Sequence, residues 1–448
     1  MPDSRLRPTP ATKAADPVER VIRLGLLGCG TVGGGVVELL HREYEDITAR
    51  TGARLEIVRV AVRDTARDRG LDLPASVFTD DPSAVVEAAD VDVVVEVMGG
   101  LEPAGTLIRR ALELGKPVVT ANKELIASQG PELYTAARDA GVDLAYEAAV
   151  AGAIPIIRPL KESLAGDRVH RVVGILNGTT NYILTRMGED GQDYASALAD
   201  AQRLGFAEAD PTADVGGHDA AAKLAIIASL AFDTVVHGDD VFREGIERVS
   251  ATDMNVAEGL GYVIRLVGIA SESDDRIEAR VHPVLLPTTH PLASVRDSFN
   301  AVYVEAAGAG ELMFYGRGAG ALPTGSAVLG DVIDVSRNLL QTARGAAETQ
   351  HRTKAIRPIG ELETQYYVLL DVEDQAGVLA EVAQTFGEHD VSIAQVWQEG
   401  SDDSAQLVLI THRALERNLR ATVEALANTN SVRSVAGVIR VESEGFGS

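Results

Sequence analysis

The segment that most constrains the fold is a glycine-rich turn that follows an apolar run near the start of the chain. Residues 21–27 (VIRLGLL) predict a buried strand, and Gly28-Cys29-Gly30-Thr31-Val32-Gly33 comes directly after it. Residues 32–44 (VGGGVVELLHREY) predict a helix that opens on these glycines. A strand, a G-x-G-x-x-G turn and a helix in this order are typical of a βαβ unit that binds a dinucleotide.

Each glycine of this turn has a physical reason. Gly28 permits the tight turn, Gly30 lets the backbone approach a pyrophosphate, and Gly33 allows the helix to pack closely on the strand. Thr31 and Val32 open the helix, whose unpaired N–H groups and partial positive charge attract phosphate. A glycine-rich turn without a ligand is the alternative, and the flanking strand and helix argue against it.

Strands and helices alternate through the first third of the chain. Further strands are predicted at 55–63, 91–97 and 116–122, with helices at 103–115 and 132–141. Strands separated by helices imply a doubly wound parallel sheet, which is a Rossmann-type fold.

After about residue 150 the pattern changes to a second α/β domain with a mostly open sheet. Strands are predicted at 169–176, 276–286 and 300–308, and long helices at 193–205 and 217–232. Residues 316–340 then predict a helix that packs back on the first domain. Residues 366–442 alternate as strand, helix, two strands, helix and strand, which predicts a ferredoxin-like βαββαβ domain.

These patterns divide the chain into five expected parts. They are a flexible tail over 1–19, a Rossmann domain over 20–150 completed by part of 316–340, a substrate-binding, catalytic and dimerisation domain over 151–340, a linker over 341–363, and the ferredoxin-like domain over 364–443.

Composition and charge narrow the class of protein. The formal net charge of -25 disfavours nucleic acid as a partner, because such a surface repels a polyanion. A single cysteine, Cys29, excludes an internal disulfide. No apolar run resembles a signal peptide or reaches the roughly 18 residues that span a membrane. We therefore expect a cytoplasmic protein with neither a membrane nor a nucleic-acid partner.

Cys29 and Arg63 bear on the chemistry of the bound dinucleotide. Enzymes that oxidise an aldehyde to the acyl level commonly use a thiolate, but Cys29 lies in the phosphate-covering turn and is expected to be a small filler. Hydride transfer at a carbonyl, an alcohol or an imine remains. Arg63 precedes Asp64 at the end of the second strand, and an arginine there suits a 2′-phosphate. We expect NADP, with NAD possible; a merely solvated Arg63 is the alternative.

Lys123 is the first candidate for acid–base chemistry. Residues 120–124 (Thr120, Ala121, Asn122, Lys123, Glu124) lie at the end of a predicted parallel strand, and ligands bind outside the carboxyl ends of such strands. This topology places Lys123 near the nicotinamide. The alternative is a solvated lysine at the start of a helix.

Asp219 and Lys223 form the second candidate group. They are four residues apart on a predicted helix, so they share one face. Lys223 interrupts an apolar run, where a lysine must pair, reach solvent or act. A simple salt bridge is the alternative, but the preceding turn adds Glu208 and Asp214, more acids than one bridge needs. This favours a site for a substrate that bears an ammonium group. His218 is adjacent and is assigned no role.

Several motifs closely resemble homoserine dehydrogenase. The resemblance extends in order over about residues 20–340, and it is carried by the glycine turn and by TANKELIA (120–127), YEAAVAGAIPII (146–157), GILNGTTNYIL (174–184) and GFAEADPTADVGGHDAAAKLAI (205–226).

The resemblance implies the reversible NAD(P)H-dependent reduction of L-aspartate 4-semialdehyde to L-homoserine. It implies that Lys223 donates the proton, with Lys123 beside it at cofactor and substrate. It further implies ligands of the substrate and of the cofactor. The substrate ligands are Glu208, Asp219, Asp214 and Thr179; the cofactor residues beyond the glycine turn and Arg63 are Thr120, Lys123, Gly205, Gly318 and Gly320.

The same resemblance implies a monovalent cation, Na⁺ or K⁺, at Glu147, Val150, Gly152 and Ile154. If this segment is extended, the carbonyl groups of Val150, Gly152 and Ile154 point the same way, because they lie two residues apart. A carboxylate with neutral oxygens suits a hard ion. An ordinary buried strand is the alternative.

The C-terminal domain resembles an ACT domain, with the match in the turn at residues 374–379 (DQAGVL). ACT domains pair and bind amino acids at their interface, so the resemblance implies threonine as an allosteric ligand and a homodimer or homotetramer. Ala376 stands where the family often has proline. A purely structural dimerisation module is the alternative.

Two other functions remain open from the sequence. One is a non-catalytic regulator that senses amino acids, which predicts a broken lysine and acid constellation. The other is a different dehydrogenase of an amino-acid aldehyde or imine, which would share the glycine turn without residues 205–223.

Overall fold

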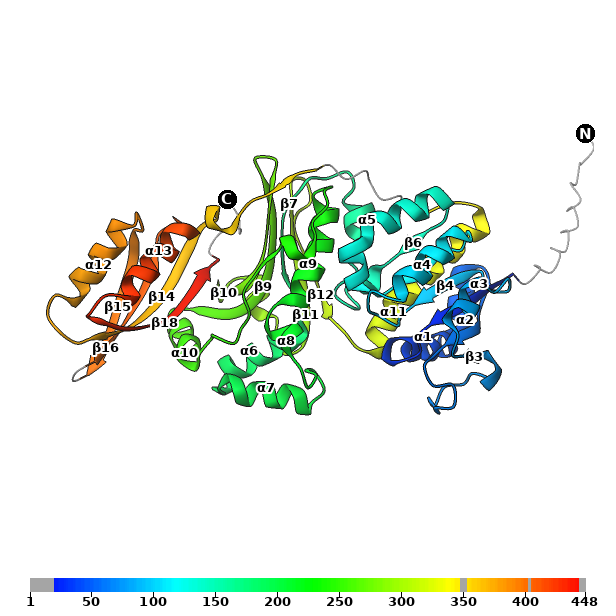
Figure 1. Cartoon of the computed structure of the whole chain (residues 1–448), viewed down its shortest axis with the longest axis horizontal. Coiled ribbons are helices and arrows are strands. Elements are labelled where there is room, and N and C mark those ends of the chain that lie inside the picture. The colour runs from blue at the N-terminus through cyan, green and yellow to red at the C-terminus, as the bar shows by residue number, and fades with distance from the viewer. Residues whose placement is uncertain (1–19, 347–352, 402–403, 443–448) are drawn as a thin grey trace, which may run out of the picture.

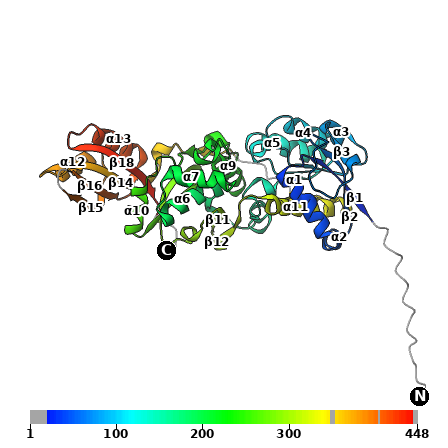
Figure 2. The ribbon, with the colours of Figure 1, turned by 90° about the horizontal axis from the view of Figure 1, so that it is seen from below.

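The computed structural model describes residues 20–346, 353–401 and 404–442, which form three parts in a row (Figure 1). The N-terminal sheet lies at one end, the large central sheet in the middle and the C-terminal unit at the other end, and the same row is seen from below in Figure 2. The expected tail over 1–19 lies outside the described residues.

The first part is a six-stranded parallel sheet in the order β3-β2-β1-β4-β5-β6, which confirms the doubly wound prediction. Its central strands are runs of valine and leucine because helices cover both faces. The strands are β1 (Val21–Leu27), β2 (Arg54–Ala61), β3 (Phe78–Thr79), β4 (Val93–Glu96), β5 (Val118–Thr120) and β6 (Leu144–Ala145).

Helices from distant parts of the chain cover this sheet. On one face lie α3 (Pro82–Glu87), α4 (Ala104–Glu113) and α5 (Lys123–Ala140). On the other lie α1 (Thr31–Arg42), α2 (Tyr44–Thr51) and α11 (Ala321–Gln341). A β-carbon at Gly35 of α1 would lie 2.1 Å from the Ala321 carbonyl oxygen, so glycine permits the close packing of α11 on α1.

The second part is built on long antiparallel strands in the order β12-β11-β7-β9-β10. Helix α6 packs on β9 and β11, and α9 packs on β7, β9 and β10. Strands β9 and β12 were not among the predicted strands. The elements are β7 (Val169–Ile175), α6 (Gly178–Asp190), α7 (Tyr194–Arg203), α8 (Thr212–Val215), α9 (His218–Ala231), β8 (Phe242–Arg243), α10 (Ala251–Gly259), β9 (Tyr262–Ser273), β10 (Arg276–Pro287), β11 (Phe299–Ala306) and β12 (Gly310–Arg317).

The C-terminal part has the predicted βαββαβ pattern, with strands in the order β18-β14-β16-β15. Its elements are β14 (Glu363–Glu373), α12 (Val378–Glu388), β15 (Ile393–Ser401), β16 (Ser404–Thr411), β17 (Ala414–Leu415), α13 (Glu416–Ala427) and β18 (Val432–Val441).

The C-terminal sheet continues the central sheet. Strand β18 pairs with β10 in parallel, with Val284 opposite Arg440 and Leu285 opposite Val441. Part of the expected linker is also bound to the central domain, because β13 (Ala355–Ile356) pairs with the start of β10. Residues 347–352 of that segment lie outside the described residues.

Ion pairs reinforce this junction. The Arg440 guanidinium donates to the buried Glu416 carboxylate at 2.9 and 2.6 Å and to Glu244 at 2.9 Å. Glu244 belongs to the central domain and Glu416 to α13, so one arginine connects the two parts. Burial opposes the charge of Glu416, but the hydrogen bonds from Arg440 outweigh it and lower its pKa.

Candidate active site

The glycine turn joins β1 to α1. Gly28 has a φ of 101°, a left-handed conformation that glycine tolerates. A β-carbon at Gly33 would lie 2.6 Å from the Gly28 carbonyl oxygen, so this approach requires glycine. Gly30 is the N-cap of α1, and a β-carbon there would meet nothing within 4 Å. The N-terminus of α1 at Thr31 and Val32 is therefore open to a phosphate.

Cys29 has the environment of a filler residue. It is 8% exposed, and burial raises the pKa of its thiol although the Arg69 charge acts in the opposite direction. A raised pKa disfavours the thiolate that covalent catalysis needs.

Arg69 is a basic residue that the sequence analysis did not single out. Its positive charge acts to lower the pKa of Cys29, against the larger effect of burial. Its guanidinium donates to the carbonyl oxygens of Asp64 and Arg67. Arg63 and Asp64 are exposed in the same loop after β2. Three arginines within residues 63–69 were the available signal for Arg69.

The ends of β4 and β5 are shaped by Glu96, which is fully buried. Its carboxylate accepts the N–H groups of Met98 and Gly99 and the Thr120 hydroxyl at 2.6 Å. The Thr120 hydroxyl in turn accepts the N–H of Asn122. Thr120 therefore supports the strand end through its side chain.

Lys123 is positioned by the cap that precedes it. The Asn122 side chain accepts the N–H of Leu125 and caps α5, so Lys123 is the first residue of that helix. The sequence predicted a helix that starts at residue 132. The helix begins at Lys123 instead, because this cap satisfies its first turn.

One carboxylate lies between two lysines at the centre of the candidate site. Nζ of Lys123 is 2.6 Å from one oxygen of Asp219, and Nζ of Lys223 is 2.7 Å from the other. The exposed side-chain fractions are 37% for Lys123, 12% for Lys223 and 7% for Asp219. The two lysines come from different domains, and Asp219 brings them together.

Electrostatics follow from this arrangement. Burial alone raises the pKa of Asp219, but the charges of Lys223 and Lys123 outweigh it and hold that pKa well below its ordinary value. Burial likewise opposes the charge of Lys123, and attraction to Asp219 outweighs it and raises the pKa of Lys123. Asp219 and Lys123 are therefore both charged near neutral pH.

Asn177 is a site residue whose role the sequence analysis missed, although it lies in a quoted motif. Its Nδ2 donates to Asp214 at 2.7 Å and to Asp219 at 2.9 Å, while its Oδ1 accepts the N–H of Thr180 and caps α6. The carbonyl of Leu176 accepts a hydrogen bond from Nζ of Lys223 at 2.8 Å. An asparagine directly before a glycine at a helix start was the available signal.

Asp214 and Thr179 lie beside this cluster. Burial raises the pKa of Asp214, and the hydrogen bond from Asn177 acts in the opposite direction. The Thr179 hydroxyl donates to the carbonyl of Phe206 at 2.7 Å and thereby holds the turn that follows Gly205.

Glu208 and Gly205 are not drawn into the cluster. Both are exposed, and within the described residues the Glu208 carboxylate makes no hydrogen bond or ion pair. Gly205 has a φ of 77°, which allows the turn between α7 and Glu208.

Gly318 and Gly320 lie in the segment that joins β12 to α11. A β-carbon at Gly318 would lie 2.3 Å from the side chain of Asn300, and one at Gly152 would lie 2.4 Å from the Gly318 carbonyl oxygen. Gly320 has a φ of 129° and is the N-cap of α11. This glycine segment therefore lies between the 147–154 loop and β11.

The expected extended conformation at 147–154 is wrong. Glu147–Ala149 is a single 3-10 turn, and Ala151 and Gly152 have φ values of 55° and 58°. The alternating-carbonyl argument therefore does not apply, because only an extended strand repeats its carbonyl direction every two residues.

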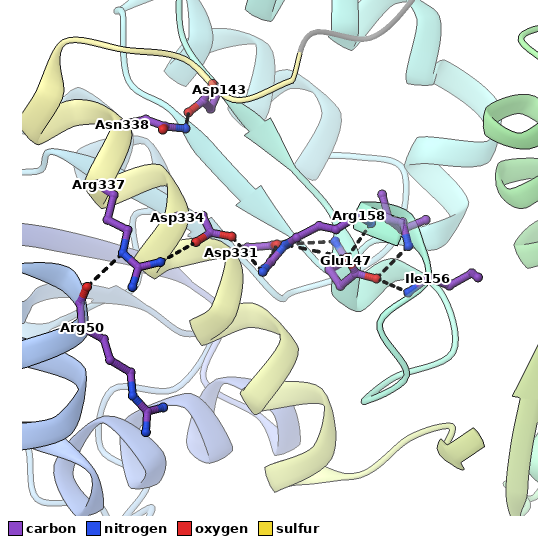
Figure 3. A network of polar contacts seen from close by, with 10 residues as sticks. Arg50, Asp143, Glu147, Ile156, Arg158, Asp331, Asp334, Arg337 and Asn338 are labelled. Carbon is purple, nitrogen blue, oxygen red and sulfur yellow. Dashed lines mark hydrogen bonds and ion pairs between the residues drawn. The ribbon is translucent and has the colours of Figure 1, made fainter. Parts of the chain in front are cut away.

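The Glu147 carboxylate is committed to the backbone (Figure 3). It accepts the N–H groups of Ile156, Ile157 and Arg158 at 2.6, 2.8 and 2.9 Å. Asp331 of α11 accepts the N–H of Glu147 and a guanidinium N–H of Arg158, at 2.8 and 2.6 Å. This network fixes the loop to α11. The described residues contain no group of three or more His, Cys, Asp or Glu side chains that could hold a metal ion.

Among the described residues, no helix combines the length and apolar character that a membrane crossing requires.

Three family models match the chain in sequence order. The model described as "Homoserine dehydrogenase, NAD binding domain" matches residues 28–147, "Homoserine dehydrogenase" matches 155–333, and "ACT domain" matches 366–430.

Curated relatives and solved structures agree with these models. A homoserine dehydrogenase of Mycobacterium tuberculosis is 51% identical over 96% of this chain and 99% of its own length. That of Corynebacterium glutamicum is 49% identical over 94% and 96%. The structure of a Thiobacillus denitrificans homoserine dehydrogenase has a TM-score of 0.90 at 40% identity and covers 95% of this chain and 99% of its own. A hyperthermophilic archaeal homoserine dehydrogenase in complex with NADPH has a TM-score of 0.60 at 27% identity and covers 70% and 98%.

Proposed function

The chain belongs to the homoserine dehydrogenase family, and from this membership we propose which of its residues carry the reaction. The enzyme interconverts L-aspartate 4-semialdehyde and L-homoserine with a nicotinamide cofactor. The bound nicotinamide supplies or accepts the hydride. The chain itself must bind the amino-acid part of the substrate and move a proton at its carbonyl oxygen.

The observation that carries the assignment is the Asp219 carboxylate between Lys123 and Lys223. A lysine ammonium has three N–H donors. Lys223 directs one to the Leu176 carbonyl and one to Asp219, which leaves one for the aldehyde oxygen of the substrate. Lys223 donates the proton in the reducing direction, and Lys123 lies beside it at the cofactor and substrate.

Acidic groups near this pair bind the ammonium of the substrate. The carboxylates of Asp214 and Asp219 both accept hydrogen bonds from Asn177, and Glu208 lies on the exposed turn that the Thr179 hydroxyl holds. A carboxylate without an internal partner, such as Glu208, is available to a cation from outside. These four residues are the proposed substrate ligands.

The cofactor binds along the carboxyl ends of the parallel strands. The glycine turn holds the pyrophosphate through Gly28, Gly30, Thr31, Val32 and Gly33. The nicotinamide is bordered by residues from three parts of the chain, which are Thr120 and Lys123, Gly205, and Gly318 and Gly320. Arg63, with Arg69 in the same loop, favours NADP over NAD because two guanidinium groups suit a 2′-phosphate. The relative solved with NADPH supports this preference.

The 147–154 loop is the proposed site of Na⁺ or K⁺. Carbonyl oxygens rather than the Glu147 carboxylate suit the ion here, because three N–H groups already occupy that carboxylate. Val150, Gly152 and Ile154 are buried, and within the described residues no donor reaches their carbonyl oxygens. Buried carbonyl oxygens that accept no hydrogen bond suit a monovalent cation such as Na⁺ or K⁺. The Glu147 carbonyl completes the proposed set.

The C-terminal domain is the proposed effector domain, with threonine as its ligand. Strand β10 occupies the β18 edge of its sheet, so β15 is the open edge. Val396 and Trp397 are exposed on β15, which supports pairing of two copies there into a homodimer or a homotetramer.

The test is steady-state oxidation of NADPH by the full chain with aspartate semialdehyde. We expect turnover in the parent and a loss of at least about 100-fold in Lys223→Ala. The control is Lys116→Met, which removes a lysine bound to the Val86 and Ala88 carbonyls and should keep parental turnover. Turnover of Lys223→Ala within a few-fold of the parent would remove Lys223 from its role.

The regulatory part is tested by titrating threonine into the same assay and into sedimentation runs. We expect inhibition or a change of oligomeric state in the parent. If threonine alters neither, the effector assignment fails while the catalytic one stands.

A further inference from the structure

Asn300 of β11 is a buried polar residue that the proposed site does not use. It is 0% exposed, and within the described residues neither its Nδ2 nor its Oδ1 has a hydrogen-bond partner. Burying an amide without partners destabilises the fold, and such groups are uncommon in proteins. Packing alone therefore does not account for an amide at this position.

The amide lies against the glycine segment at 316–320 and against the start of α6. A β-carbon at Gly318 would be 2.3 Å from its Cγ and Nδ2, and one at Gly178 would be 3.3 Å from its Oδ1. Gly178 opens α6 directly after Asn177, which binds Asp219. Asn300 therefore lies between the lysine and aspartate cluster and the glycine segment at 316–320.

We propose that Asn300 binds the carboxamide of the nicotinamide. This rests on the proposed placement of the nicotinamide beside Gly318 and Gly320. The ring carbon that carries the hydride must face the substrate at Lys223. The carboxamide is attached to the neighbouring ring carbon, so it must lie close to the same cluster. One carboxamide offers an acceptor and a donor together, which satisfies both atoms of Asn300 at once.

The glycine segment controls access to this amide. In the structure the main chain of Gly318 covers it, and any side chain at 318 would collide with it. Gly316, Gly318 and Gly320 bear no side chains, and the segment connects β12 to α11 of the cofactor domain. The proposal therefore requires that this segment moves when the cofactor binds and exposes Asn300 to the ring.

Asn181 serves as a comparison. Its Oδ1 also has no partner, but its Nδ2 donates to the carbonyls of Val295, Asp297 and Phe299. That amide holds the 295–299 segment in place, which is a structural role. Asn300 makes no such bond, so the two asparagines should respond differently to substitution.

The test compares two cofactors in the parent and in Asn300→Leu. Homoserine oxidation is measured with NADP⁺ and with its 3-acetylpyridine analogue, in which a methyl group replaces the amide nitrogen. Losing one hydrogen bond should raise the cofactor KM of the parent up to about tenfold with the analogue. In Asn300→Leu the KM for the analogue divided by the KM for NADP⁺ should fall, so that the two KM values differ by no more than about twofold.

Thermal unfolding provides the second measurement. Asn300→Leu replaces an unpaired amide by an apolar group of similar size, so its Tm should equal or exceed that of the parent. Asn181→Leu should lower the Tm and keep the parental KM ratio. If Asn300→Leu does not fold, Asn300→Ser is measured in its place with the same expected ratio.

A folded Asn300 variant that keeps the parental ratio of the two KM values would overturn the proposal. This includes a variant in which the KM values for both cofactors rise by the same factor. Absence of turnover in the parent with NADP⁺ would instead contradict the proposed function. The two failures are therefore distinguishable.

Discussion

Asp219 offers one carboxylate oxygen to Lys123 at 2.6 Å and the other to Lys223 at 2.7 Å. A lysine from the cofactor domain and one from the central domain thus share a single buried counter-ion. The charge state of Asp219 affects both lysines, and the site depends on the two domains being held together.

Asp219→Asn should reduce kcat/KM by at least about 100-fold, because the lysines lose the group that orients them. Asp219 raises the pKa of Lys123, so the variant should lower that pKa. Its residual activity should decline at a lower pH than that of the parent. The measurement is a pH profile of kcat/KM, with Asp190→Asn as a surface control. An alkaline limb at the parental pH would contradict this electrostatic coupling.

Asn177 has two separable functions. Asn177→Ala should destabilise the protein by about 1 kcal/mol through loss of the α6 cap and should also impair turnover. Asn177→Ser keeps a capping side chain, so its stability should return towards that of the parent. Its activity should stay low, because a hydroxyl does not bridge Asp214 and Asp219. Urea unfolding and kcat are compared; full recovery of both in the serine variant would remove the bridging role.

Gly33 and Gly34 form a matched pair for the cofactor turn. A β-carbon at Gly33 would lie 2.6 Å from the Gly28 carbonyl oxygen, whereas one at Gly34 would meet nothing within 4 Å. Gly33→Ala should therefore weaken NADPH binding by at least about tenfold, equivalent to about 1.4 kcal/mol. Gly34→Ala should bind as the parent does. Fluorescence titration with NADPH distinguishes them, and equal affinities would refute the steric argument.

Arg440→Met should loosen the C-terminal domain, because it leaves Glu416 buried with fewer positive partners. Removing one member of a buried ion pair costs about 3–5 kcal/mol. Calorimetry should show that the unfolding transition of the C-terminal domain occurs at a lower temperature than in the parent. The control is Arg420→Met, whose partner is the same Glu416 but whose side chain is 54% exposed. Similar effects of both substitutions would show that burial does not set the strength of this junction.

His290 should make stability depend on pH. Burial, with a smaller repulsion from Arg171, lowers its pKa from 6.5 to about 4. Between these values the unfolded chain binds a proton that the folded chain excludes. The free energy of unfolding should therefore rise with pH across this window, by up to about 3 kcal/mol.

His290→Asn should remove this dependence while keeping an acceptor for the N–H of Leu292. Urea unfolding of parent and variant at pH 4 and pH 7 measures the difference. A constant difference between the two proteins would contradict the burial of a neutral imidazole.

Local patterns were sufficient for much of the fold and part of the site. The strand, glycine turn and helix at 21–44 follow from periodicity and glycine spacing, and the structure has β1 and α1 there. The face shared by Asp219 and Lys223 follows from helix geometry, because four residues make about one turn. The βαββαβ order of the C-terminal domain was likewise readable from alternating segments.

By itself, then, the sequence determined elements whose signals lie within a few neighbouring residues, together with motifs that identify the family. Only the tertiary structure decided that Lys123 meets Asp219, that β18 extends the central sheet through β10, and that 147–154 turns rather than extends. It also decided that Asn300 lies unpaired against Gly318. Each of these depends on segments distant in the chain, whose contacts are set by packing and leave no periodic trace in either segment.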